Sequence, residues 1–325
     1  MIVRRFAAAV VVAAIGATAC EQAPPLSPYD PVVHAADVEE WRAWRHGELT
    51  KPDGWLSLSG LYWLTPGEHR FGADPEADLV YARAGVPPHL GTFTVTGGQV
   101  EFAPEPGLEI GVGETVPAVD VVFDRALLAD GPMAPTIMRW GDLQWFVIVR
   151  EDHLALRLKD AASALIVGFD GMPNFDLTSE WRFEATFEVY DPPRTITVPN
   201  VFGSLGEEES PGAVVFELNG ETFRIDMWHD SDDPENFFTA FGDLTNAHTS
   251  YGAGRFLWVD APDEWGRTVV DFNRSYNPPC ALSPFATCPL PPIRNRLLLA
   301  IEAGERVFST SVELPSAPPV DADGV

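Results

Sequence analysis

Histidines and carboxylates cluster between residues 229 and 248, in a spacing that could hold a cation. His229 is followed by Asp230 and Asp232, and His248 lies farther along the chain. Carboxylates at alternate positions can supply oxygen ligands to a hard cation, and histidine together with aspartate can hold zinc or iron. The sequence therefore leaves a divalent metal site open at these residues, while no other cofactor is expected. The alternative is an acidic, solvated loop between two strands.

Three residues are candidates for general acid–base catalysis. Asp243, His248 and Asp271 could transfer protons in a hydrolase, with or without a metal ion. The chain has no G-x-S-x-G, H-E-x-x-H, Walker or C-x-x-C motif that would fix their roles. Gly252-Ala253-Gly254 is a G-x-G pattern that precedes a strand, so it predicts a tight turn and not a dinucleotide site.

A proline-rich stretch over residues 271–297 carries polar groups suited to ligand binding. Its cysteines, Cys280 and Cys288, most simply form a local disulfide, with a metal-binding thiolate pair as the alternative. A stiff loop of this kind would hold four polar side chains in fixed positions, those of Asn273, Arg274, Tyr276 and Asn277. The alternative is that these groups satisfy buried backbone around an irregular loop.

The basic residues are almost all arginine. Only Lys51 and Lys159 are lysines, so lysine-nucleophile or Schiff-base chemistry has two candidates, neither of them in a supporting motif. With 48 acidic and 21 basic residues the net charge is -27. This balance excludes nucleic-acid binding, which depends on clustered lysine and arginine.

The first twenty residues are typical of an export signal. Arg4 and Arg5 precede an apolar run from Phe6 to Ala19 that is too short to span a membrane, so residues 1–19 are expected to be a signal peptide. The last three residues of this run resemble a bacterial lipobox, which predicts lipidation of Cys20. A lipidated Cys20 would leave the other two cysteines as an even pair.

These features predict a lipoprotein on the periplasmic face of the outer membrane, with a soluble periplasmic or secreted protein as the alternative. Its partners would be the membrane, through the N-terminal lipid, and a small polar ligand. Residues 20–35 are rich in proline and are expected to form a tether. A single β-rich domain over residues 36–313 and a flexible tail over 314–325 complete the predicted organisation.

Short alternating segments between regular turns predict a mostly β fold, an antiparallel sandwich or barrel with one short N-terminal helix. The clearest hairpin surrounds Asn219-Gly220, where a two-residue turn pairs Phe216 with Phe223 and Val214 with Ile225. Further strands and hairpins are expected at 92–101, 143–158, 182–190, 237–241, 255–259 and 267–272. Helical periodicity is confined to residues 37–48 and 296–303, and residues 200–212 are expected to be a surface loop.

Three stretches resemble the domain of unknown function 1684 family. The first begins Asp53-Gly54-Trp55-Leu56, after Trp41-Arg42 and Arg45. The second runs from Phe241-Gly242-Asp243-Leu244-Thr245 to Tyr251-Gly252-Ala253-Gly254-Arg255. The third begins at Asp271-Phe272-Asn273 and contains Tyr276-Asn277-Pro278-Pro279-Cys280, Thr287-Cys288-Pro289-Leu290-Pro291-Pro292, Asn295-Arg296-Leu297 and Ala303-Gly304-Glu305.

The resemblance implies no established activity. It places seven polar residues in signatures without assigning them a role, namely Asp243, Tyr251, Arg255, Asp271, Asn273, Tyr276 and Asn277. Arg255 could pair with Asp243 or Asp271, in a structural role as readily as a functional one.

The leading hypothesis is an exported β-rich protein that binds a small polar ligand between residues 229–255 and 271–297. Arg255 or Arg274 would bind an anionic group, tryptophan rings would stack on the ligand, and Tyr251, Asn273, Tyr276 and Asn277 would bind it through hydrogen bonds. One alternative is a hydrolase that uses aspartate and histidine, and another is an envelope scaffold without a pocket.

Overall fold

The computed structural model describes residues 29–113, 126–127, 135–150, 153–230 and 233–310. The expected signal peptide, the lipidation site Cys20, most of the expected tether, Asp232 and the C-terminal tail lie outside these residues. No helix among the described residues is long and apolar enough to cross a membrane.

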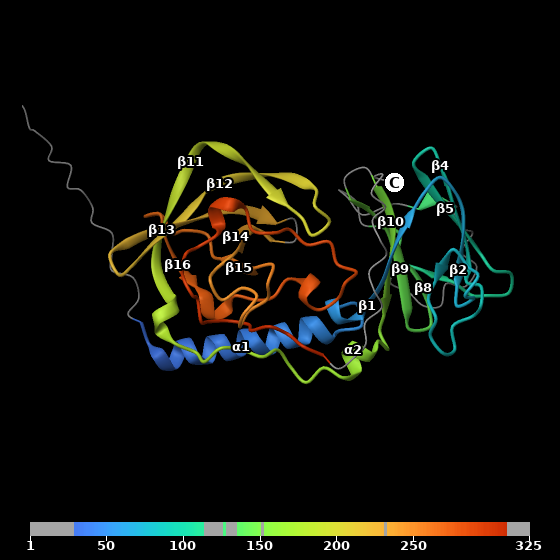
Figure 1. Cartoon of the computed structure of the whole chain (residues 1–325), viewed down its shortest axis with the longest axis horizontal. Coiled ribbons are helices and arrows are strands. Elements are labelled where there is room, and N and C mark those ends of the chain that lie inside the picture. Colours follow the sequence, from blue (N-terminus) through green and yellow to red (C-terminus); the bar gives the residue numbers. More distant parts are fainter. Residues whose placement is uncertain (1–28, 114–125, 128–134, 151–152, 231–232, 311–325) are drawn as a thin grey trace, which may run out of the picture.

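Strands dominate the structure and form three sheets, which confirms the predicted mostly β class. Apart from the β2–β3 pair, every strand pair is antiparallel. Two sheets form the N-terminal half (β1–β10) at the right of Figure 1, and the third forms the C-terminal half (β11–β16) at the left.

The N-terminal half contains two five-stranded sheets. One has the order β1-β10-β9-β8-β6, with bounds Leu58–Leu64, His153–Asp160, Leu143–Arg150, Met138–Trp140 and Gly111–Val112. The other has the order β3-β2-β4-β5-β7, with bounds Leu79–Val80, Gly67–Gly72, Gly91–Thr96, Gln99–Pro104 and Ala126–Leu127. A buried cluster that includes Phe71, Phe93, Phe102 and Trp145 packs between them.

The C-terminal half is built on a six-stranded sheet with the order β15-β14-β13-β12-β11-β16. The bounds are Arg255–Val259, Asp233–Phe241, Glu221–Asp230, Leu205–Leu218, Arg182–Pro199 and Arg267–Asp271. Its two faces bury different clusters because adjacent strand residues point to opposite sides. Phe237 belongs to a cluster within the C-terminal half, whereas Phe238 belongs to a cluster that also contains Leu61 and Ile148 of the N-terminal half.

Turn chemistry sets the register of the hairpins as predicted. In the β12–β13 hairpin Phe216 pairs with Phe223 and Val214 with Ile225, and this confirms the expected register. Asn219 and Gly220 have φ angles of 54° and 81°, the left-handed conformation that a type I′ turn requires at both central positions. The predicted β4–β5 and β9–β10 hairpins are also present.

Helix α1 (Pro31–Thr50) runs along the C-terminal half at the bottom of Figure 1 and begins earlier than the sequence indicated. The side chain of Asp30 accepts hydrogen bonds from the backbone of Val32 and Val33, and Pro31 occupies the first turn. Residues 31–35, expected in the tether, are therefore helical. The helix ends at Thr50 because Pro52 disfavours a helical Lys51.

Two other expectations at the level of elements were wrong. Residues 296–303 contain no helix, and only the short 3₁₀ turn η5 (Ile293–Asn295) precedes them. Residues 205–212 belong to β12 rather than to a surface loop, because their backbone pairs with the second part of β11. The remaining helical pieces are α2 (Ala164–Val167), η1 (Trp55–Ser57), η2 (Ser179–Trp181), η3 (Phe272–Arg274) and η4 (Pro279–Ala281).

Candidate functional site

Two connected hollows lie beside α1. The larger, here called the α1 cavity, has a volume of about 820 Å³ and is lined by Trp41, Trp44, Arg45, Glu48, Lys51, Asp53, Gly54, Trp55, Lys159, Phe238, Phe256, Trp258, Asp260, Arg274, Tyr276 and Pro279. The smaller, here called the His34 hollow, has a volume of about 430 Å³ and is lined by Tyr29, Asp30, Val33, His34, Asp37, Arg182, Trp258, Asp260, Val269, Asp271 and Arg274. Trp258, Asp260 and Arg274 belong to both.

Aromatic rings from several elements form much of the wall of the α1 cavity. Trp41 and Trp44 come from α1, Trp55 from η1, and Phe238, Phe256 and Trp258 from β14 and β15. Several of these rings are held in place. The indole N–H of Trp258 donates to the hydroxyl of Tyr276 at 2.8 Å, and the rings of Phe238 and Trp258 pack with centroids 5.1 Å apart. Such fixed rings offer flat apolar surface to a ligand.

The α1 cavity also collects positive charge in a strongly acidic chain. Lys51 and Lys159 are the only lysines of the protein, and both line this cavity. Lys51 is ion-paired with Glu48 at 2.6 Å, and the hydrogen bond to Glu48 raises the pKa of Lys51. Arg45 is buried and pairs with Glu305 at 3.1 Å. These two cations are therefore matched by carboxylates of the protein.

Lys159 differs from Lys51 in its surroundings. Its ammonium donates to the backbone oxygen of Asp53 at 2.5 Å and lies 5.8 Å and 5.9 Å from the ring centroids of Trp55 and Phe146. Among the described residues no carboxylate lies within ion-pairing distance of it. Burial lowers the pKa of Lys159 to about 8, although the charge of Asp53 acts in the opposite direction.

Arg274 is the other cation of the α1 cavity that has no carboxylate partner among the described residues. It follows β16 in the turn η3 and lines both hollows. The structure gives it no ion pair or hydrogen bond with any described residue, and its buried Nε has no partner there. A guanidinium in this state can form a bidentate contact with a carboxylate or phosphate.

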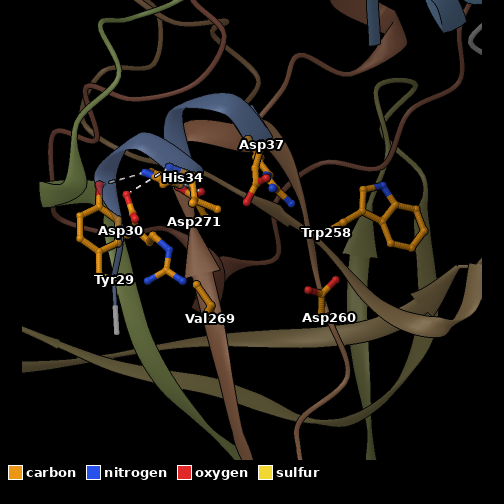
Figure 2. A pocket seen from close by; sticks show the side chains of 11 residues that line it. Tyr29, Asp30, His34, Asp37, Trp258, Asp260, Val269 and Asp271 are labelled. Atoms are coloured by element: carbon orange, nitrogen blue, oxygen red, sulfur yellow. Dashed lines mark hydrogen bonds and ion pairs between the residues drawn. The ribbon is translucent and has the colours of Figure 1, made fainter. Parts of the chain in front are cut away.

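The His34 hollow contains a short chain of polar side chains. Nε2 of His34 lies 2.7 Å from Oδ2 of Asp271, and the hydroxyl of Tyr29 lies 3.1 Å from Nδ1 of His34. Figure 2 shows these three residues together. Trp258 and Asp260 lie across the hollow. Asp271, a candidate from the sequence, therefore meets a histidine that the sequence did not single out.

Several other candidates from the sequence lie in buried structural networks. Arg255 is fully buried and donates to Asp243 at 2.5 Å, to the backbone oxygen of Ile301 at 2.8 Å and to that of Ala303. Asp243 also accepts hydrogen bonds from the backbone and hydroxyl of Thr245. These two residues thus hold the C-terminal segment against β14 and β15 and do not line either hollow.

The signature asparagines and Tyr251 also bond to the protein itself. Asn273 and Asn277 are fully buried; the first bonds to both backbone groups of Thr178, and the second donates to the backbone oxygen of Arg306 at 2.7 Å. The hydroxyl of Tyr251 donates to the backbone oxygen of Cys280 at 3.3 Å. Of the expected ligand-binding residues, only Arg274 and Tyr276 line the α1 cavity.

The histidines of the possible metal site are not brought together. His229 is exposed near the end of β13, where its ring contacts Phe237 of β14, whereas His248 is exposed beyond the other end of β14. Neither lines a hollow described above, and no group of three or more histidine, cysteine, aspartate or glutamate side chains suited to a metal occurs among the described residues. The side chain of Asp230 lies outside the described part.

The predicted disulfide between Cys280 and Cys288 is confirmed, with the two Cα atoms 6.1 Å apart. The bridge closes the loop behind Tyr276, so it supports the wall of the α1 cavity instead of supplying ligands to a metal. Cys288 is buried among the residues that join the two halves.

The sequence did not indicate most of the residues that line the α1 cavity. Trp41, Trp44 and Trp55 were named only as parts of an expected helix or a signature, and they share a cavity because α1 packs against η1 and η3. From the sequence, Arg274, Tyr276 and tryptophan rings in general were expected at a ligand site, and the scarcity of lysine was a further signal, since both lysines line this cavity.

These observations define a mostly antiparallel β protein with a helix-lined cavity between its two halves. The chain belongs to the family described as "Protein of unknown function (DUF1684)", whose model matches residues 167–306. The matched region contains Arg274, Trp258 and Tyr276, whereas α1, Lys51 and Lys159 precede it. The α1 cavity is therefore lined by residues from inside and outside the matched region.

One solved structure that resembles the chain is the solution NMR structure of an uncharacterised protein of Haloarcula marismortui. It is 32% identical over 42% of this chain and 77% of that chain, with a TM-score of 0.36. No curated protein matches the chain.

Proposed function

We propose that the protein binds a small anionic molecule with a flat apolar ring in the α1 cavity. The observation that carries this proposal is the placement of Lys159 and Arg274, neither of them ion-paired with a described residue, in one cavity walled by aromatic rings. A carboxylate or phosphate would supply the missing charge partner, and the rings would bury the apolar part.

The strongly negative net charge of the chain strengthens the argument that the cations of the α1 cavity bind an anion. The chain carries a net charge of -27, so an anion is repelled by most of the surface and must be captured locally. A cavity that gathers both lysines and Arg274 provides such a local exception. The scaffold alternative gains no comparable support, because it predicts an exposed apolar patch instead of a cavity lined with charges.

The cellular location remains a proposal based on the N-terminal sequence. Export and lipidation at Cys20 would place the domain at the periplasmic face of the outer membrane, where the α1 cavity would meet small molecules of the envelope. The disulfide between Cys280 and Cys288 supports an oxidising compartment.

Calorimetry with simple probes tests the binding function. We expect benzoate and phenyl phosphate to bind, and the neutral isostere benzamide to bind at least about tenfold more weakly, which corresponds to about 1.4 kcal/mol. Arg274→Gln should weaken benzoate binding by a similar factor. Arg70→Gln, which removes an exposed cation on β2, is the matched control and should leave binding unchanged. Equal binding of benzoate and benzamide would contradict the proposal.

A second candidate, the hydrolase, is favoured by one observation in the His34 hollow. His34 lies between Asp271 and Tyr29, so a proton could pass along these three side chains. Nitrophenyl esters, phosphates and glycosides provide a direct assay. His34→Gln should abolish any hydrolysis, whereas the exposed His248→Gln should not; dependence on His248 alone would reject this arrangement.

A further inference from the structure

We propose that Lys159 is a nucleophilic amine that forms an imine with an aldehyde or ketone bound in the α1 cavity. The inference rests on the proposed function, because it assigns a carbonyl group to the anionic ligand of that same cavity. It makes Lys159 a covalent attachment point, which neither the family nor the sequence motifs assign.

The backbone around Lys159 holds the base of its side chain firmly. The residue lies near the end of β10 and is flanked by Leu58 of β1 and Gln144 of β9 in the sheet. Its amine reaches the backbone oxygen of Asp53 and two aromatic rings, so the tip is positioned at the cavity wall rather than extended into bulk water. A fixed amine loses less entropy on attacking a bound carbonyl.

The hydrogen bond from the Lys159 amine to the backbone oxygen of Asp53 leaves the amine able to react. A carbonyl oxygen is neutral, so it accepts a hydrogen bond without stabilising the ammonium as strongly as a carboxylate would. With a pKa of about 8, roughly half of Lys159 is the neutral amine at pH 8. Lys51 is the opposite case, because its pairing with Glu48 favours the charged form. Only the neutral amine carries the lone pair that attacks carbon.

The reaction balances without an oxidant or reductant. The lone pair of Lys159 forms a C–N bond to the carbonyl carbon, and the C=O electron pair moves to oxygen, which takes up a proton. The nitrogen releases a proton, which gives a carbinolamine, and the hydroxyl of the carbinolamine takes up a second proton. The C–O bond then breaks and water leaves as the nitrogen lone pair forms the C=N bond, and loss of the second nitrogen proton gives the imine. Glu48, Asp53 and Asp260 line the cavity and provide carboxylates for the proton transfers.

The other side chains that line the cavity indicate the chemical class of the carbonyl compound. Arg274 would hold its carboxylate or phosphate, and the rings of Trp55 and Trp258 would enclose its apolar part. The class is therefore an aromatic or similarly flat aldehyde or keto acid with an anionic group.

Reductive trapping with para-formylbenzoate and sodium cyanoborohydride tests this assignment on the whole protein. Peptide mass spectrometry then locates the adduct, and the chain supplies its own control because Lys51 is the only other lysine and lines the same cavity. At pH 8 we expect the adduct at Lys159 to form at least about tenfold faster than at Lys51. Its rate should rise with pH to a midpoint near the pKa of Lys159. Equal or faster modification of Lys51 would overturn the inference.

Two variants and a second probe separate this inference from the proposed function. Lys159→Met should abolish trapping, whereas Arg70→Gln, which removes an exposed cation outside the cavity, should retain it. The alcohol para-hydroxymethylbenzoate has the same shape and charge but no carbonyl, so its binding measures the cavity alone. If the alcohol binds and the aldehyde is not trapped at Lys159, the inference fails and the binding function stands. If the aldehyde is trapped while the alcohol does not bind, the binding function fails. If the aldehyde is not trapped and the alcohol does not bind, both the inference and the proposed binding function are wrong.

Discussion

The guanidinium of Arg255 donates to the carboxylate of Asp243 at 2.5 Å, and both side chains are fully removed from solvent. The same guanidinium reaches the backbone oxygens of Ile301 and Ala303, so it ties the end of the domain to β14 and β15. Burial lowers the pKa of Arg255, and the charge of Asp243 opposes that effect. This pair is a structural clamp, even though the sequence offered both residues as candidates for function.

Removing the clamp should destabilise the fold without acting on the α1 cavity directly. Arg255→Met leaves the buried carboxylate of Asp243 without its partner, which typically costs about 3–5 kcal/mol. Urea unfolding followed by circular dichroism measures the change. The double variant Arg255→Met with Asp243→Asn should recover part of the loss, since the uncompensated charge is gone. An unchanged stability of the single variant would disprove the structural role.

A second buried pair should anchor α1. Arg45 of α1 pairs with Glu305 and also donates to the backbone oxygen of Asn277 at 2.9 Å. Glu305→Gln should therefore lower stability by about 3–5 kcal/mol and accelerate amide exchange along α1. The exposed Glu302→Gln provides the control and should change neither quantity. If amide exchange in α1 is the same in both variants, the pair of Arg45 and Glu305 does not hold α1 in place.

The disulfide between Cys280 and Cys288 should contribute a modest part of the stability. The two cysteines are eight positions apart in the sequence, and for a loop of this length the loop-entropy model gives a stabilisation of about 2–3 kcal/mol. Replacing both cysteines by serine should lower the urea midpoint accordingly. Peptide mapping without reductant should recover the two cysteines in one linked fragment, and separate fragments would refute the bridge.

Lys159 should give stability a distinct pH dependence. Its folded pKa of about 8 lies below the ordinary value of 10.5, so between these values the unfolded state binds more protons. The cost of burying the ammonium is fully present below pH 8 and is relieved as the pH rises toward 10.5. The stability of Lys159→Met relative to the wild type should thus be greatest below pH 8 and decline above it. Unfolding free energies of both proteins at pH 7, 9 and 10 provide the measurement; a difference that does not vary with pH would contradict the lowered pKa.

Lipidation of Cys20 is a prediction from the N-terminal sequence alone. Mass spectrometry of the mature N-terminus should find a diacylated or triacylated Cys20 as the first residue. A free thiol at that position would reject the lipoprotein hypothesis and leave the soluble periplasmic or secreted alternative.

Short-range patterns explain what the sequence determined by itself. The register of the β12–β13 hairpin followed from Asn219-Gly220 and the alternation of Phe216 and Phe223, because a two-residue turn fixes both the spacing and the face. The disulfide between Cys280 and Cys288 followed in the same way, since the two cysteines lie close in the chain and the remaining cysteine has a separate expected role. The start of α1 was missed because Asp30 and Pro31, which cap it, were attributed to a proline-rich tether.

Only the tertiary structure decided which residues share a site. His34 contacts Asp271, which lies 237 residues later in the sequence. Lys159 lines the same cavity as Lys51 only because α1 packs over the junction between the two halves. Local turn chemistry and hydrophobic alternation carry no information about such long-range neighbours, which result from the joint burial of many apolar side chains. The signature residues Arg255, Asn273 and Asn277 show the same limit: their types suit binding or structure equally, and only complete burial against backbone groups identifies them as structural.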